Sequence, residues 1–266
     1  MLQLRDLRAL LIDMDGVLYR GDTPIVGAQA FLAWLTQRGF PFLLVTNNST
    51  LDASAYERKL AGMGIAVPAQ RILTSAMATA DYLARNLGPG TRVLMIGESG
   101  LECSLRERGI EISDQAPQAV VVGMDRHITY AKLRTATLAI RAGAQFIATN
   151  SDRTLPTEAG IVPGAGAIVA ALVAATDRAP VIIGKPEPPL LELAIAKLGQ
   201  PPELTAALGD RLETDIAGGK RLSLPTILVL SGVTEQPPPP QSDLHPTWTF
   251  RSVRELHAAW QESLSR

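Results

Sequence analysis

Short apolar runs alternate with helix-length segments along most of the chain, and this alternation constrains the fold more than any other feature of the sequence. Amphipathic patterns typical of helices lie between most of the runs, as in 51–63, 129–142 and 188–198. Strands that alternate with helices form βαβ units and a parallel sheet, so the sequence predicts an α/β fold. The predicted strands are 9–13, 42–46, 71–75, 92–97, 119–123, 145–149, 180–184, 206–210 and 226–230.

The predicted strands fall into two groups according to the residues at their carboxyl ends. Four strands end in reactive side chains or lead straight into them, namely Asp13, Thr46, Lys185 and Asp210. The strands between about 92 and 149 mostly end in Gly or lead into ordinary turns. We therefore predict a discontinuous core domain, residues 1–78 and 180–266, that carries an inserted α/β domain, residues 79–179.

Composition narrows the range of partners. The 266 residues are 46% hydrophobic and carry 25 basic and 26 acidic side chains, a formal net charge of −1. The chain therefore has no excess of positive charge that would attract nucleic acid or an anionic membrane. The most apolar later segment, 164–176, is too short and too rich in Ala to span a bilayer and predicts a buried helix. Cys103 is the only cysteine, which fits a reducing compartment. We expect a cytoplasmic protein with no nucleic-acid or membrane partner.

Polar residues gather where the reactive strands end. In open α/β sheets ligands bind at the carboxyl ends of the strands, so these side chains are expected to meet at one site. Carboxylates are predicted to cluster there together with hydroxyl, amide and ammonium groups that bind anions. The candidate residues are Asp13, Asp15, Thr46, Asn47, Asn48, Lys185, Asp210 and Asp215.

This combination of residues has a specific chemical meaning. Several carboxylates at one site repel one another unless a hard cation binds them, and oxygen ligands without His or Cys favour Mg²⁺. Mg²⁺ usually binds through one or two carboxylates and a substrate phosphate, whose other oxygens would be held by Lys185 and the Thr46 hydroxyl. The site therefore predicts phosphoryl transfer, with a carboxylate as the natural nucleophile.

Four segments resemble the motifs of the haloacid dehalogenase-like (HAD) hydrolase superfamily, and they occur in the order found there. These are "DMDGVLYRG", "VTNNS", Lys185 and "GDRLETDI". The segments 121–133, 148–168 and 230–234 also resemble its NagD-like, or p-nitrophenyl phosphatase, branch. The resemblance implies a Rossmann-like core with a large α/β cap inserted between the second and third motifs, in agreement with the insertion inferred from the strand ends.

The resemblance also implies a role for each candidate residue. Asp13 would be the nucleophile that becomes an aspartyl-phosphate, and Asp15 the acid and base that serves the leaving group and then the attacking water. Mg²⁺ would be held by Asp13, the backbone carbonyl of Asp15, and Asp210. The remaining candidates would neutralise the phosphoryl group (Thr46, the Asn47 amide, Lys185), shape the rim (Asn48), or orient metal-bound waters or Lys185 (Asp215).

Two positions distinguish this chain from relatives. Ser223 stands where relatives usually carry Gly at a helix end, so that helix end is expected to need a different cap. The loop 149–160 is the best candidate for reading the leaving group. Its Leu155 occupies the place where some pyridoxal phosphate-specific relatives carry His, which argues against that specificity.

Three functions are compatible with these residues. The first is a Mg²⁺-dependent phosphatase of small phosphorylated metabolites, of the sugar phosphate, nucleotide, phosphoglycolate or aryl phosphate type. The second is a phosphotransferase or mutase that passes the phosphoryl group from Asp13 to another hydroxyl. The third is a non-enzymatic phosphate sensor, which predicts a lost nucleophile or metal acid, whereas every expected position is filled. The apolar cap helices permit a homodimer without requiring one.

Overall fold

The computed structural model describes residues 2–157 and 160–265, and its chain divides into two compact units. The first unit comprises Met1–Thr46, Tyr56–Leu73 and Lys185–Arg266, and the second comprises Asn47–Ala55 and Thr74–Gly184. The domain assignment made from the sequence, with boundaries at 78/79 and 179/180, stays a prediction.

The first unit is built on a six-stranded sheet in the order β15-β14-β13-β1-β4-β5. Its pairs β14–β15, β13–β14, β1–β13 and β1–β4 are parallel. β1 is buried at every residue, as expected of a strand covered on both faces. The strands are β1 (Ala9–Ile12), β4 (Phe42–Thr46), β5 (Ile72–Thr74), β13 (Thr205–Gly209), β14 (Thr226–Val229) and β15 (Trp248–Phe250), with a separate ribbon of β2 (Tyr19–Arg20) and β3 (Thr23–Pro24).

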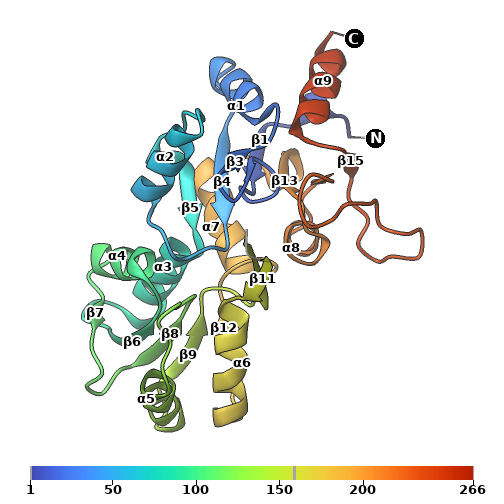
Figure 1. Ribbon diagram of the computed structural model, residues 1–266. Helices are drawn as coiled ribbons and strands as arrows, with labels where there is room; N and C mark the ends of the chain where they lie inside the picture. Colours follow the sequence, from blue (N-terminus) through green and yellow to red (C-terminus); the bar gives the residue numbers. More distant parts are fainter. Residues whose placement is uncertain (1, 158–159, 266) are drawn as a thin grey trace. The chain divides into compact units, whose positions relative to one another are not determined.

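Helices cover this sheet, and α7 contacts both β1 and β4 (Figure 1). α1 packs on α9 through an aromatic cluster in which the Trp34 and Trp260 rings lie 5.7 Å apart. The helices are α1 (Ala28–Gln37), α2 (Ala53–Gly62), which begins in the second unit, α7 (Pro188–Leu198), α8 (Ala217–Arg221) and α9 (Val253–Leu264), with short turns η1 (Leu4–Asp6), η2 (Ala69–Arg71) and η3 (Pro202–Leu204) and the π-helical η4 (Leu212–Ile216).

The second unit contains its own sheet, in the order β12-β9-β8-β6-β7, and all four neighbouring pairs are parallel. Its core includes Val120, Phe146 and Leu172, contributed by two strands and a helix. The strands are β6 (Arg92–Ile96), β7 (Glu111–Ile112), β8 (Ala119–Val122), β9 (Gln145–Ala148) and β12 (Val181–Ile182), beside the antiparallel hairpin β10 (Thr154–Thr157) and β11 (Gly160–Pro163).

Four helices flank the second sheet, and α5 and α6 both contact β8 (Figure 1). Threonine side chains cap two of them: Thr74 accepts from the Met77 N–H, and Thr129 from the Lys132 N–H. The apolar segment predicted as a helix is α6, which buries one face. The helices are α3 (Ser75–Leu87), α4 (Ser99–Glu107), α5 (Tyr130–Arg141) and α6 (Ala165–Thr176).

The prediction of an α/β fold with parallel sheets is confirmed. Each of the nine predicted strands is present within a residue or two of its predicted bounds, whereas β2, β3, β7, the β10–β11 hairpin and β15 were not predicted. In the described ranges no helix is both long and apolar enough to cross a membrane. Glu158 and Ala159, in the predicted specificity loop, lie outside the described residues.

Ser223 lies just past the end of α8 in a left-handed backbone conformation, with a φ of 56°, which glycine would reach without a steric penalty. Its N–H donates to the Lys220 carbonyl, and the Leu224 N–H donates to the Gly219 carbonyl, so main-chain bonds close the end of α8. The expectation that this cap differs from that of the relatives stays a prediction.

Candidate active site

The strand order of the first unit brings three predicted site residues to one edge of its sheet. β13, β1 and β4 are adjacent and parallel, so their carboxyl ends lie together. Asp13 directly follows β1, Asp210 directly follows β13, and Thr46 is the last residue of β4. The Asp13 N–H donates to the Leu208 carbonyl at 2.8 Å, which continues the ladder and fixes where its side chain begins. Ligands of open α/β sheets bind at such an edge.

Lys185 lies at the centre of the polar contacts in this unit. It is 4% exposed, and its Nζ donates to Asp13 Oδ1 at 2.6 Å, to Asp215 Oδ1 at 2.6 Å and to the Val45 carbonyl at 3.2 Å. An ammonium group has three donors, which these three acceptors match in number. Lys185 thus holds the Asp13 carboxylate in one orientation and ties it to Asp215.

The carboxylates of Asp13, Asp210 and Asp215 form a group that could hold a divalent cation. One oxygen from each lies within 4.8 Å of the other two. The donor set contains oxygen only, which suits the hard cation Mg²⁺. The residues therefore fit the metal that the family resemblance implies. The Asp15 side chain does not belong to this group.

Main-chain donors and a glycine hold Asp210 in place. Its Oδ2 accepts from the Val233 N–H at 2.6 Å, and its carbonyl accepts from the Thr234 N–H at 3.1 Å. On the other side, Gly16 has a φ of 74°, and any Cβ there would collide with the Asp210 carboxylate. Gly16 is therefore required both for the turn and for the close approach of the Asp210 carboxylate.

Asp215 lies in the π-helical turn η4, a distortion often found at functional sites. Its Oδ2 accepts from the Arg211 N–H at 3.1 Å, while its Oδ1 accepts from Lys185. The side chain is 4% exposed. Because both oxygens are bonded, the carboxylate is fixed beside the other two acids.

Burial and the charges of neighbouring acids raise the pKa values of Asp13 and Asp210. Burial raises the pKa of Asp13 well above its ordinary value; Lys185 opposes this rise, and the charges of Asp215 and Asp210 add to it. Burial and then Asp215 raise the pKa of Asp210 to about 6. For Lys185, burial alone would lower the pKa, but Asp13 and Asp215 raise it, so the lysine stays charged. A cation would relieve the repulsion among the acids.

We expect the stability of the metal-free protein to depend on Asp210 in a defined pH window. Its folded pKa of about 6 exceeds the ordinary 3.8, so its ionised form destabilises the fold above pH 6, and this cost is relieved as the pH falls toward 4. Asp210→Asn should therefore stabilise the protein at pH 7.5 in chelator by on the order of 2 kcal/mol, a rise of several degrees in the unfolding midpoint.

The measurement is thermal unfolding of both proteins in chelator between pH 4.5 and 8. The difference between variant and parent should shrink steadily on the acid side of pH 6. A difference that does not vary with pH would contradict the electrostatic account of Asp210.

Asp15 differs from the buried acids because its side chain is solvent-accessible. Surrounding protein atoms still desolvate the carboxyl enough to raise its pKa, against the lowering effects of Lys59 and Arg211. A carboxyl with a raised pKa that stays in contact with solvent can carry a proton to or from a reacting oxygen. These properties suit the acid–base role that the resemblance implies.

The three residues of the second motif fall on both sides of the division between units. Thr46 belongs to the first unit and is 4% exposed, whereas Asn47 and Asn48 belong to the second. Within the second unit the Asn47 carbonyl accepts from Ser75 Oγ at 2.5 Å and from Asn150 Nδ2 at 2.8 Å.

The side chains of the two asparagines are bonded within the second unit as well. Asn47 Nδ2 donates to the Asp152 carboxylate at 3.2 and 3.3 Å. Asn48 Oδ1 accepts from the Thr50 N–H at 2.9 Å and from the Thr50 hydroxyl at 2.8 Å. Six of the eight predicted site residues thus lie in the first unit and two in the second.

Several residues that support the site were not predicted. Ser231 Oγ donates to the Gly16 carbonyl at 2.7 Å, and Arg20 Nε donates to the Ser231 carbonyl at 2.7 Å. These contacts join the segment 230–234 to the loop that follows β1, and the Val233 N–H joins it to Asp210 after β13. That segment was noted for its resemblance to the branch, but two of these three contacts use its main-chain atoms, the Ser231 carbonyl and the Val233 N–H, which residue identity does not reveal.

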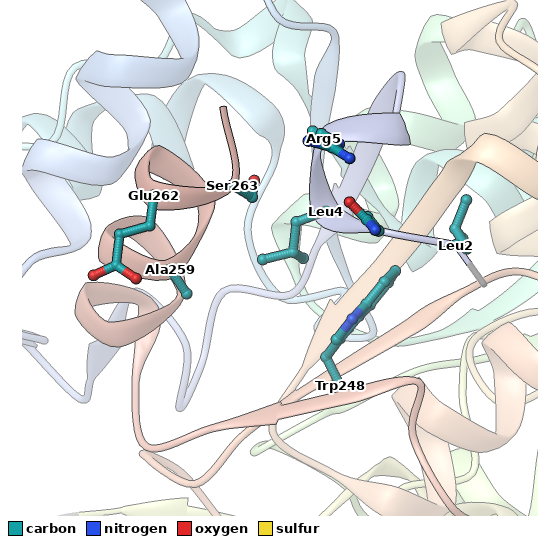
Figure 2. A pocket seen from close by; sticks show the side chains of 8 residues that line it. Leu2, Leu4, Arg5, Trp248, Ala259, Glu262 and Ser263 are labelled. Carbon is teal, nitrogen blue, oxygen red and sulfur yellow. The ribbon is translucent and has the colours of Figure 1, made fainter. Parts of the chain in front are cut away.

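A separate cavity of about 550 Å³ lies in the first unit, away from the predicted residues (Figure 2). The N-terminal segment, β15 and α9 form it, with the Trp248 ring and Glu262 among its lining side chains. None of the candidate residues lines it. The candidate site therefore lies outside this cavity.

Comparisons with known proteins show the family to which the chain belongs. Residues 10–111 match the family model of haloacid dehalogenase-like hydrolases, and residues 182–256 match a second model described as HAD-hydrolase-like. An acid sugar phosphatase of Staphylococcus saprophyticus is 41% identical over 254 residues, which cover 95% of this chain and 98% of that protein. The chain therefore belongs to the haloacid dehalogenase-like hydrolase family.

Solved structures place the chain more narrowly. A 4-nitrophenylphosphatase from Thermotoga maritima superposes with a TM-score of 0.90 at 36% identity, covering 97% of this chain and 99% of that one. NagD from E. coli K-12 superposes with a TM-score of 0.87 at 34% identity, covering 94% and 98%. Within the family the chain belongs to the NagD-like branch, and it is a HAD-type phosphatase.

Proposed function

We propose that this phosphatase hydrolyses small phosphate monoesters with the help of Mg²⁺ and through a phosphorylated Asp13. The observation that carries the proposal is the Lys185 bridge between Asp13 and Asp215, with the Asp210 carboxylate within 4.8 Å of both acids. A buried ammonium and three clustered acids supply both charges that a phosphoryl group and its cation need.

The chain's own residues would divide the reaction into two displacements. In the first, a carboxylate oxygen of Asp13 bonds to phosphorus as the bond to the leaving oxygen breaks, and that oxygen takes the proton of Asp15. In the second, water bonds to phosphorus, gives its proton to Asp15, and the bond between Asp13 and phosphorus breaks. Inorganic phosphate leaves, and both acids return to their starting states.

Three residues and a metal ion would support these displacements without exchanging protons. Lys185 holds the Asp13 carboxylate and adds positive charge beside it. Thr46 and the main-chain amide of Asn47 would donate to the phosphoryl oxygens. Mg²⁺, held by Asp13, Asp210 and the Asp15 carbonyl, would supply the charge that offsets the phosphate and the clustered acids.

The substrate class follows from the relatives. The S. saprophyticus relative is named for acid sugar phosphatase activity and the T. maritima relative for 4-nitrophenyl phosphate. We therefore propose sugar phosphates as the substrate class, with aryl phosphates as convenient reporters. In the loop 149–160, Leu155 lies in the β10–β11 hairpin opposite Val162, and this loop is the proposed reader of the leaving group.

The test is a phosphate-release screen with Mg²⁺ and with excess chelator. We expect release from sugar phosphates and from p-nitrophenyl phosphate, lost in chelator and restored by added Mg²⁺. Nucleoside monophosphates and phosphoglycolate complete the panel. Undiminished activity in chelator would contradict the metal requirement. Phosphate transfer to an added sugar without release to water would favour a phosphotransferase.

A further inference from the structure

The side chain of Tyr19 is the least explained polar group near the candidate site. Tyr19 is 0% exposed, and within the described residues its hydroxyl makes no well-formed hydrogen bond, although it lies close enough to the Asp15 carboxyl for a hydrogen bond to affect the pKa values of both groups. A buried hydroxyl without a well-formed hydrogen bond destabilises a fold, and phenylalanine would fill the same space without that cost. The tyrosine at this position therefore calls for a role outside packing.

The turn that follows β1 brings Tyr19 back to Asp15. The Gly16 N–H donates to the Tyr19 carbonyl at 2.8 Å, the Tyr19 N–H donates to the Met14 carbonyl at 3.4 Å, and Asp15 and Tyr19 form an isolated β-bridge. Main-chain bonds thus hold the two residues side by side. The tyrosine ring has few torsions, so its hydroxyl occupies a fixed place beside the acid.

The hydroxyl and the carboxyl act on each other electrostatically. Burial, and after it the charge of Asp15, raises the pKa of Tyr19 well above its ordinary value, so the phenol keeps its proton and can only be a donor at neutral pH. In the other direction, the Tyr19 hydroxyl lowers the pKa of Asp15, against the effect of burial. The protonated Tyr19 hydroxyl is therefore a donor next to the Asp15 carboxyl, which is an acceptor.

Positively charged side chains interact with both Tyr19 and Asp15. Lys59 Nζ lies 4.7 Å from the centroid of the Tyr19 ring and 3.4 Å from Asp22 Oδ1, so the ring is covered by an ammonium group that is itself anchored. Lys59, Arg211 and Lys185 are also the cations that act on the Asp15 carboxyl. Lys59 therefore packs on the Tyr19 ring. The uncharged Tyr19 hydroxyl is a further donor to Asp15, besides the positive charges of Lys59, Arg211 and Lys185.

We propose that Tyr19 is a positioning residue whose hydroxyl donates to the Asp15 carboxyl and holds it toward the leaving-group oxygen. This inference rests on the proposed function, in which Asp15 is the acid and base. Tyr19 keeps its own proton throughout: it donates to one carboxyl oxygen while the other oxygen of Asp15 gives a proton to the leaving group and later accepts one from water. Its contribution is therefore largest where the leaving group needs that proton.

The experiment compares Tyr19→Phe with the parent protein on two substrates, in the presence of Mg²⁺. A sugar phosphate has a strongly basic alkoxide as its leaving group, whereas p-nitrophenolate is weakly basic and can leave without a proton. We expect kcat/KM, which reports the first displacement alone, to fall about tenfold for the sugar phosphate, a part of the usual contribution of acid–base catalysis. The kcat/KM for p-nitrophenyl phosphate should change less than about twofold, because its leaving group needs no proton; the second displacement is common to both substrates and does not enter this ratio.

Two further variants calibrate the result. Tyr130→Phe makes the same change at a tyrosine that is 82% exposed and should behave as the parent does. Asp15→Asn should show the same selectivity in kcat/KM as Tyr19→Phe but more strongly. The thermal midpoint of Tyr19→Phe should stay close to that of the parent, because phenylalanine fills the same space, so a loss of activity would not reflect a loss of folding.

The possible outcomes separate the inference about Tyr19 from the proposed function on which it rests. An equal loss on both substrates, or no loss on either, overturns the positioning role of Tyr19. Selectivity in Asp15→Asn but not in Tyr19→Phe overturns the Tyr19 inference alone. If Asp15→Asn shows no selectivity, or if the parent releases phosphate from neither substrate, the proposed function fails, and the inference that rests on it fails too.

Discussion

Asp13→Asn is expected to abolish phosphate release while leaving the protein folded. The amide nitrogen is a poor nucleophile and the amide oxygen carries no negative charge, so the first displacement has no attacking group. Loss of a group that forms the covalent intermediate typically lowers kcat by on the order of 10³-fold or more. The fold should survive because the change removes a buried charge whose pKa is already raised by its surroundings.

The measurement is phosphate release from p-nitrophenyl phosphate and a sugar phosphate, with circular dichroism and thermal unfolding as tests of folding. Mass spectrometry of the variant should show that the amide at position 13 is intact, since deamidation would restore the parent. Asp177→Asn is the matched control, because it makes the same change at an 88% exposed side chain. Full activity in an intact Asp13→Asn protein would contradict the covalent mechanism.

The parallel sheet could be predicted because its strands are buried on both faces. Runs such as Ala9–Ile12 and Ala119–Val122 consist of apolar residues throughout, and polar residues mark where the strands end. The two-residue strands β2 and β3 carry no such pattern: Tyr19 is buried and Arg20 exposed, which is too short an alternation to identify a strand. Their position depends on main-chain bonds of the turn after β1.

The candidate residues could be identified from the sequence, but their contacts could not. A polar residue at the end of a predicted strand is visible in the sequence, as at Asp13 and Asp210. The contacts of Lys185 with Asp215 and with the Val45 carbonyl depend on how segments far apart in the chain pack together. The donor on Asp210 is the main-chain N–H of Val233, which any residue but proline would supply.

The second large effect is expected for Lys185→Met, which removes a cation from the centre of three carboxylates. Lys185 is 4% exposed and donates at 2.6 Å to both Asp13 and Asp215, so neither acid can turn to water without disturbing the fold. Removing one partner of a buried ion pair typically costs about 3–5 kcal/mol, because the other charge stays buried and unpaired. Activity should fall at the same time, because Asp13 loses both its orientation and the positive charge beside the phosphoryl group.

Denaturant unfolding in chelator at pH 7.5 measures the stability loss, and phosphate release with Mg²⁺ measures the activity. Lys197→Met is the matched control, since this exposed lysine of α7 should tolerate the same change with little effect. The loss should shrink as the pH falls toward 5, because protonation of Asp13 and Asp210, whose pKa values are raised, removes negative charge from the cluster that Lys185 balanced.

The double variant Lys185→Met/Asp215→Asn separates electrostatics from packing. Removing one of the unpaired acids should restore part of the stability, because fewer buried charges then repel one another, whereas activity should stay low without the cation beside Asp13. If Lys185→Met does not fold, the double variant still tests whether unpaired buried charges cause the loss of stability. A double variant no more stable than Lys185→Met would show that the lost stability came from packing of the lysine stem. The buried ion pairs would then not be what holds the acids together in the metal-free protein.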